Sequence, residues 1–275
     1  MMTFGVETAG GARAETRRDL LDLLVNALGK AELRGLWPFL ETDPGVGAQV
    51  QDVSSRAYHG ANVAAFGTDP FLFGGVLAYV FDGTDEFIVV PDNLLLSFDG
   101  TTDKPFSVGA CIYQRANAAI KTIVAKWDVA GDDREWRLYM DAAEKLTMEL
   151  CDDGVPNAEQ GRLYDTALGT DQWYFVAGTY DGSGGATAGA GINLYAGDFS
   201  AETWLGAVDD ADANGVGVYV DMENTAETVN IGSDTSAGGA EFFLGSMALV
   251  WVTARELTEA ELINVWNICQ EIARA

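Results

Sequence analysis

The segment at residues 171–182 reads DQWYFVAGTYDG. Its aromatic and β-branched residues are typical of a β-strand, and Asp181-Gly182 is a turn signal that ends it. Alternate residues of a strand point to opposite faces, so Trp173 and Phe175 share one face while Tyr174 points to the other. We expect Trp173 and Phe175 to lie in the core of a sheet. The alternative for Trp173 is an exposed platform for a ligand.

The same period-two pattern recurs elsewhere in the chain. Apolar residues alternate in three further runs, which are Phe106, Val108, Ala110 and Ile112; Trp136, Leu138 and Met140; and Leu146, Met148 and Leu150. Turn signals rich in Asp and Gly separate these runs, for example at residues 99–100 and 152–154. Many short strands between turns predict an all-β chain folded as an antiparallel sandwich or jelly roll.

Two segments instead have a helical period. Leu21, Leu24, Val25 and Leu28 form one apolar stripe, which predicts a helix over residues 16–30. Near the other end, Thr258 and Glu261 have the spacing of a capping box, which predicts a helix over residues 258–273.

Composition excludes several classes of function. The formal net charge is −26, which repels nucleic acid and anionic membranes, so neither is expected as a partner. The three cysteines have no short spacing and are expected to be free, buried thiols. A single histidine argues against a Ser-His-Asp triad and against a metal held by histidines. The first residues lack the basic and apolar regions of an export signal, which predicts synthesis without Sec export.

Several segments, taken in order, resemble the laminin-G-like family of concanavalin-A-like sandwiches. They are residues 35–39, 50–60, 81–91, 105–108, 123–126, 136–139, 171–182, 192–195, 229–232 and 257–261. The resemblance implies an all-β, concanavalin-A-like (laminin-G-like) antiparallel β-sandwich jelly roll with an N-terminal helical arm at residues 1–34. Residues 35–275 then form the sandwich with its C-terminal helix. This fold hosts lectins, adhesion modules, hydrolases and structural domains, so the resemblance alone does not choose a function.

Calcium is the one cofactor that the resemblance raises, because relatives often bind it through loop oxygens. Asp52 lies in the loop where a ligand is expected, and Asp128, Asp132 and Asp133 form a second acidic loop. The strand at residues 245–251 carries no acidic residue where relatives often have one, which speaks against a structural calcium.

Hydrolases with this fold carry a Glu-x-Asp-x-Glu-like run of carboxylates, and this chain has none. Asp221-Met222-Glu223 has the nearest spacing, and we interpret it as a solvated turn or strand end. We therefore predict that the chain is not an enzyme. Trp204 and Tyr139 are the aromatic candidates for stacking on a sugar, with Tyr113 and Tyr219 beside them.

These observations favour a structural display protein on a virion surface, either as a capsid decoration or at the tail, that binds host or environmental glycans. The alternatives are a cellular carbohydrate-binding or adhesion module, extracellular or at the cell surface, and a glycan-active hydrolase. We predict that residues 1–34 mediate assembly with other virion proteins or with copies of the chain. Leu21, Leu24, Val25 and Leu28 would make that contact. The alternative is that this stripe packs on its own domain.

Overall fold

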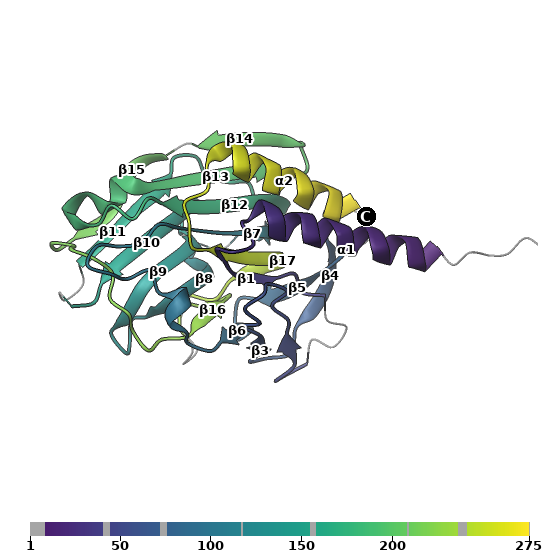
Figure 1. Cartoon of the computed structure of the whole chain (residues 1–275), viewed down its shortest axis with the longest axis horizontal. Helices are drawn as coiled ribbons and strands as arrows, with labels where there is room; N and C mark the ends of the chain where they lie inside the picture. The colour runs from purple at the N-terminus through teal and green to yellow at the C-terminus, as the bar shows by residue number, and fades with distance from the viewer. Residues whose placement is uncertain are drawn as a thin grey trace, which may run out of the picture.

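Two antiparallel sheets face each other, and two helices lie on the outer side of one of them (Figure 1). This is a computed structural model, and it describes residues 9–40, 45–71, 76–116, 118–154, 158–207, 209–235 and 241–274. The architecture confirms the predicted antiparallel β-sandwich with a helix near each end of the chain.

The first sheet is the one that the helices cover. Its strands follow one another in the order β14 (Thr203–Ala207), β13 (Ile192–Asp198), β12 (Gln172–Tyr180), β7 (Phe106–Gln114), β17 (Leu244–Thr253), β5 (Val76–Asp82) and β4 (Gly67–Phe71). A further strand, β1 (Leu33–Trp37), pairs with β17.

The second sheet lies opposite the first. Its order is β15 (Asp209–Val216), β11 (Ala158–Tyr164), β10 (Leu146–Asp152), β9 (Asp133–Met140), β8 (Lys121–Asp128), β16 (Val229–Ile231), β6 (Ile88–Val90), β3 (Gly60–Asn62) and β2 (Gln49–Val50).

The space between the sheets is filled by the alternating runs that the sequence analysis identified. The apolar residues of the run at 106–112 and those of the runs at 136–140 and 146–150 belong to one buried cluster. Its centre is aromatic, since the ring centroids of Phe98 and Phe106 are 4.1 Å apart and those of Phe106 and Trp136 are 5.7 Å apart. Burial on this scale is the main stabilising term of the fold.

A second apolar layer lies between the first sheet and the helices α1 (Ala9–Ala27) and α2 (Glu259–Arg274). Trp173 and Phe175 point into this layer, whereas Tyr174 faces the core between the sheets. The expected burial of Trp173 and Phe175 is confirmed. Because the helices cover the outer face, both faces of β12 are buried, and Tyr174 is as much a core residue as its neighbours.

The C-terminal helix begins as predicted. The N–H of Thr258 donates to Glu261 Oε2 (2.9 Å), and the N–H of Glu261 points back to Thr258 Oγ1 (3.4 Å), which is the reciprocal pattern of a capping box. Helix α1 starts at Ala9, earlier than the predicted residue 16. Alanine is the strongest helix former, and the alanines that precede Thr16 extend the helix toward the N-terminus. Within the described residues, neither helix is long and apolar enough to cross a membrane.

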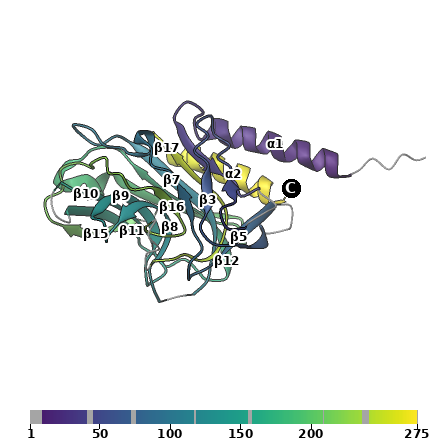
Figure 2. The same ribbon diagram turned by 90° about the horizontal axis from the view of Figure 1, so that it is seen from below.

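The apolar stripe of α1 packs on the chain's own domain. Leu24 and Leu28 are fully buried in the layer above the first sheet, and Leu21 and Val25 pack partly buried against it. Figure 2 shows α1 and α2 side by side. The assembly role expected for Leu24 and Leu28 is therefore corrected, because both leucines are already fully buried in the layer between these helices and the first sheet. Strand β1 also begins at Leu33, so the expected boundary after residue 34 falls inside a strand of the sandwich.

Candidate functional site

Asp52 holds the loop after β2 together through its carboxylate. Its Oδ1 accepts hydrogen bonds from the N–H groups of Leu36 (2.9 Å) and Ser54 (2.8 Å). Its Oδ2 accepts from the hydroxyl of Ser54 (2.6 Å) and the N–H of Tyr58 (2.8 Å). A carboxylate offers about four acceptor positions, so these bonds use all of them. The single histidine, His59, accepts from the N–H of Asp52 in the same loop.

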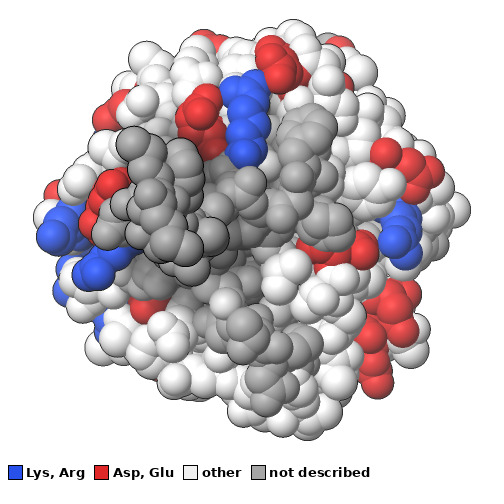
Figure 3. Space-filling model, turned by 90° about the vertical axis from the view of Figure 1, so that its right-hand side faces the viewer, with Lys and Arg blue, Asp and Glu red and all other residues white. Residues whose placement is uncertain are grey.

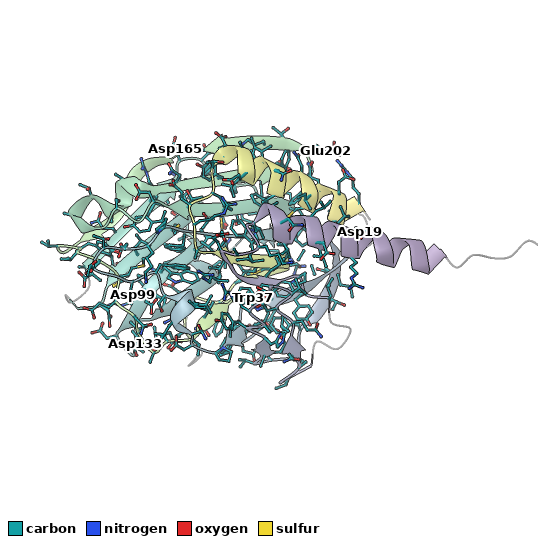
Figure 4. The ribbon with its side chains drawn as sticks, in the orientation of Figure 1. Asp19, Trp37, Asp99, Asp133, Asp165 and Glu202 are labelled. Atoms are coloured by element: carbon teal, nitrogen blue, oxygen red, sulfur yellow. The ribbon has the colours of Figure 1, made fainter. Side chains whose placement is uncertain are left out.

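The other expected calcium ligands lie in the hairpin between β8 and β9, where Figure 4 labels Asp133. Asp128 caps this turn by accepting from the N–H of Ala130 (2.9 Å), and Asp132 pairs with Arg134 (2.7 Å). Among the described residues, the acidic group whose ligand atoms converge within 4.8 Å is Asp82, Asp85 and Glu86, and it includes none of the expected ligands. The expected residues do not fit a shared calcium site, since calcium needs about six to eight convergent oxygens.

Tyr139 is buried instead of exposed, which corrects the expectation that its ring meets a sugar. Its hydroxyl donates to Glu149 Oε1 (2.8 Å), and the guanidinium of Arg137 lies 4.4 Å from its ring centroid. Tyr219 is buried too, and its hydroxyl donates to Asp103 (2.6 Å). The hydroxyl partners lie on the neighbouring strand for Tyr139 and 116 residues away in sequence for Tyr219, so residue type alone could not reveal these contacts.

Trp204, the other aromatic candidate, is partly buried beside α2. Its indole N–H donates to Glu259 Oε1 (2.9 Å), and its ring centroid lies 6.2 Å from that of Tyr195 and 5.6 Å from that of Trp266. These contacts join β14 to the C-terminal helix. Trp204 therefore has a packing role that occupies much of its ring.

Strands β8 and β9 of the second sheet carry buried basic residues that form ion pairs. Lys126 pairs with Glu135, while Arg137 binds both Glu149 (2.7 Å) and Glu241 (2.6 Å). Burial raises the pKa of Glu135, and the ammonium of Lys126 opposes that rise. Each of these carboxylates has a cation as its partner, which is the arrangement that makes a buried charge tolerable.

The carboxylates of Asp221 and Glu223 belong to the connection between β15 and β16, and no strand holds them. Between them, Met222 is buried, and its N–H donates to Asp103 (2.6 Å). Glu223 is exposed. The segment is thus an irregular loop, neither a strand end nor a hydrogen-bonded turn.

A pocket of about 200 Å³ lies at one end of the first sheet, on the side that the helices cover. We call it the Tyr113–Trp173 pocket; it is lined by Asp69, Tyr113, Arg115, Trp173 and Ser246. The strand register brings these residues together, because Tyr113 on β7 lies between Trp173 on β12 and Ser246 on β17. The ring centroids of Tyr113 and Trp173 are 5.7 Å apart, and their planes are tilted by 57°, so the rings form an angled wall.

The polar end of the pocket is an Asp–Arg pair. Ser246 donates to Asp69 Oδ2 (3.1 Å), and Arg115 Nη2 lies 3.9 Å from the same oxygen. Both charged side chains are close to half exposed, at 44% for Asp69 and 46% for Arg115. The sequence analysis considered Tyr113 and Trp173 separately and did not identify Asp69, Arg115 or Ser246.

The backbone beneath the pocket is fixed from inside the protein. The fully buried ammonium of Lys121 donates to the carbonyl oxygen of Arg115 (3.0 Å) and pairs with Glu144. The N–H of Arg115 donates to the carbonyl oxygen of Leu244 (3.1 Å). A site held by buried bonds of this kind is formed before a ligand arrives.

Comparisons with known proteins describe the fold. No curated protein matches the chain. It is similar to the binding domain of botulinum neurotoxin serotype G, with 11% identity and a TM-score of 0.52 over 81% of this chain and 48% of that one. It is also similar to the serotype D ligand binding domain in complex with N-acetylneuraminic acid, with 14% identity and a TM-score of 0.53 over 89% and 52% of the two chains. The chain thus spans about half the length of these neurotoxin structures.

A third similar structure is domain 4 of AbnA, an extracellular GH43 arabinanase from Geobacillus stearothermophilus, in complex with arabinotriose. The identity is 13% and the TM-score 0.55, over 85% of this chain and 98% of that one. At such identities the likeness shows the fold alone. Residues 82–263, more than half of the chain, match the family model described as the concanavalin A-like lectin/glucanases superfamily. The chain therefore belongs to the concanavalin A-like lectin/glucanase superfamily.

Proposed function

We propose that the chain is a non-catalytic glycan-binding domain and that the Tyr113–Trp173 pocket is its sugar site. The observation that supports this proposal is the composition of the pocket, in which an angled aromatic wall faces an exposed Asp–Arg pair. A sugar ring has apolar C–H faces and a rim of hydroxyl groups. The partly buried ring of Tyr113, packed against the buried Trp173, matches such a face, and the half-exposed Asp–Arg pair matches the hydroxyls.

The similar structures add support of a weaker kind. Two of them, the serotype D ligand binding domain and the arabinanase domain, are described in complex with N-acetylneuraminic acid and with arabinotriose. Their likeness to this chain extends to the fold, so the sugar site is argued here from the pocket's own residues.

The same pocket argues against catalysis. Glycoside hydrolysis generally needs two carboxyl groups that flank the scissile bond. Of the residues that line the pocket, Asp69 alone carries a carboxylate. We therefore propose binding without turnover.

Glycan-array binding by the full chain tests the proposal, with affinities for positive glycans then measured by titration. Tyr113→Ala removes most of the exposed part of the wall and should abolish binding. Leu94→Ala, which changes an exposed apolar residue elsewhere, should leave it unchanged. The proposal is wrong if the chain binds no glycan on the array, or if Tyr113→Ala stays folded by circular dichroism and still binds. Hydrolysis of a bound glycan that is lost in Glu223→Gln would contradict the non-catalytic assignment.

We further propose that the domain is displayed on a virion surface, with a cellular adhesion module as the alternative. The support is the position of α1, whose N-terminal half projects beyond the sandwich in both ribbon views (Figures 1 and 2). A projecting helix offers a point of attachment outside the sandwich. Quantitative mass spectrometry of purified particles tests this proposal. A fixed copy number per particle supports it, and absence from particles contradicts it.

A further inference from the structure

We infer that the Tyr113–Trp173 pocket selects an uncharged sugar residue over an acidic one, an inference that rests on the proposed glycan-binding function. The feature that decides between the two is the Asp69–Arg115 pair at the polar end of the pocket. Its two charges differ in sign and are almost equally exposed, so the pair is neutral overall.

The spacing of the pair suits a hydroxyl group. Arg115 Nη2 and Asp69 Oδ2 are 3.9 Å apart, which exceeds the usual range of about 2.7–3.2 Å for a hydrogen bond. A hydroxyl both donates and accepts, so one hydroxyl can donate to Asp69 while it accepts from Arg115. This bridge satisfies both charged groups, and neither a purely donating nor a purely accepting ligand group can form it.

Ser246 orients the carboxylate of Asp69 for this bridge. Its hydroxyl donates to Asp69 Oδ2, the same oxygen that Arg115 approaches, and thereby fixes the orientation of the carboxylate. Among the described residues, Oδ1 of Asp69 accepts no hydrogen bond and remains available to a second hydroxyl. Neighbouring hydroxyls on a sugar ring are spaced for such a carboxylate, which makes a vicinal diol the expected recognition element.

A sugar carboxylate, in contrast, is disfavoured at the Asp69–Arg115 pair. It would approach Arg115 only by coming close to the like charge of Asp69, and two such charges about 4 Å apart repel each other in water and more strongly where solvent is excluded. The chain's net charge of −26 adds a general repulsion. Among the coloured residues on the face drawn in Figure 3, basic side chains form small separate groups between acidic and uncharged ones.

The test compares matched ligands. The probes are the methyl glycosides of glucose, galactose and mannose, each beside its uronate, which differs only by a carboxylate at C6. Chemical-shift titration of the full chain gives each affinity. We expect at least one neutral glycoside to bind about tenfold or more tightly than its uronate. Asp69→Asn should weaken neutral binding by roughly tenfold and should narrow the gap between glycoside and uronate.

Asp133→Asn is the matched control, because it removes one negative charge at the end of the sandwich away from β4 (Figures 1 and 4). It should change neither the affinity for the neutral glycoside nor the affinity for the uronate. This control separates the local effect of Asp69 from the effect of net charge. Uronates that bind as well as their glycosides, or better, would overturn the inference and leave the glycan-binding function intact. If neither these probes nor any array glycan binds, the proposed function fails and the inference with it.

Discussion

Replacing Asp52 by asparagine tests whether this residue acts through hydrogen bonds or through a metal. Asparagine keeps one acceptor oxygen, which can still serve the N–H groups of Leu36 and Ser54. Its amide nitrogen takes the place of Oδ2. The hydroxyl of Ser54 can turn to accept from that nitrogen, but the N–H of Tyr58 cannot, and it is left without an acceptor.

The expected loss of stability follows from this one N–H group, which has no acceptor in the variant. A buried donor without a partner costs about 1–3 kcal/mol, and a bond to a charged acceptor lies near the upper end of that range. We expect Asp52→Asn to lower the free energy of unfolding by about 2–3 kcal/mol, measured by urea denaturation with tryptophan fluorescence. Asp128→Asn is the control, because an amide oxygen can still accept from Ala130 in the turn; its effect should stay within about 0.5 kcal/mol.

The same measurement with calcium and with a chelator separates the two explanations. If hydrogen bonds alone hold the loop, the stability of the parent protein is the same in both. A parent that loses stability in chelator, together with an Asp52→Asn variant that no longer responds, would mean that Asp52 binds calcium and that our reasoning is wrong. A loss below about 0.5 kcal/mol for Asp52→Asn would also refute it.

Further predictions concern the helical layer, the buried ion pairs and one titrating carboxylate. Leu24→Ala should cost about 2–5 kcal/mol in urea denaturation, whereas Leu23→Ala, on the exposed side of α1, should cost less than about 0.5 kcal/mol. Arg137→Met should cost about 3–5 kcal/mol in the same assay, because it leaves Glu149 buried without its cation. Burial and a neighbouring carboxyl raise the pKa of Glu86 to about 7. The folded chain therefore binds this proton more tightly than the unfolded chain does. The stabilisation that comes from the bound proton is fully present below about pH 4.5 and should be lost as the pH rises to about 7. Glu86→Gln should remove that part of the pH dependence, and an unchanged profile would contradict the assignment.

Much of the fold could be predicted because strands and helices impose different periods on apolar residues. The alternation at residues 106–112 and 136–140 predicted buried faces, and both runs lie between the sheets. The capping pair of Thr258 and Glu261 is local, so its spacing alone located the start of α2. The face toward which Trp173 points was harder to predict, because it depends on helices from both ends of the chain.

The candidate site could not be predicted in the same way. Its residues are far apart in sequence, and pairing across β12, β7, β17, β5 and β4 brings them together. The burial of Tyr139 was difficult to predict for a different reason. A tyrosine in a strand is as suited to a binding surface as to a buried network, and the position of Glu149 on the neighbouring strand decides between them.

The antiparallel packing of α1 and α2 has a consequence for how the domain can be joined to other proteins. The first and last helices run side by side in opposite directions, so the start of α1 and the end of α2 lie on the same side of the sandwich (Figure 1). A domain built this way can be spliced into a surface loop of a host protein as readily as it can be fused at a terminus. Joining the start of α1 to the end of α2 through a linker and opening the chain at an exposed turn should likewise yield a circular permutant with the same sheets.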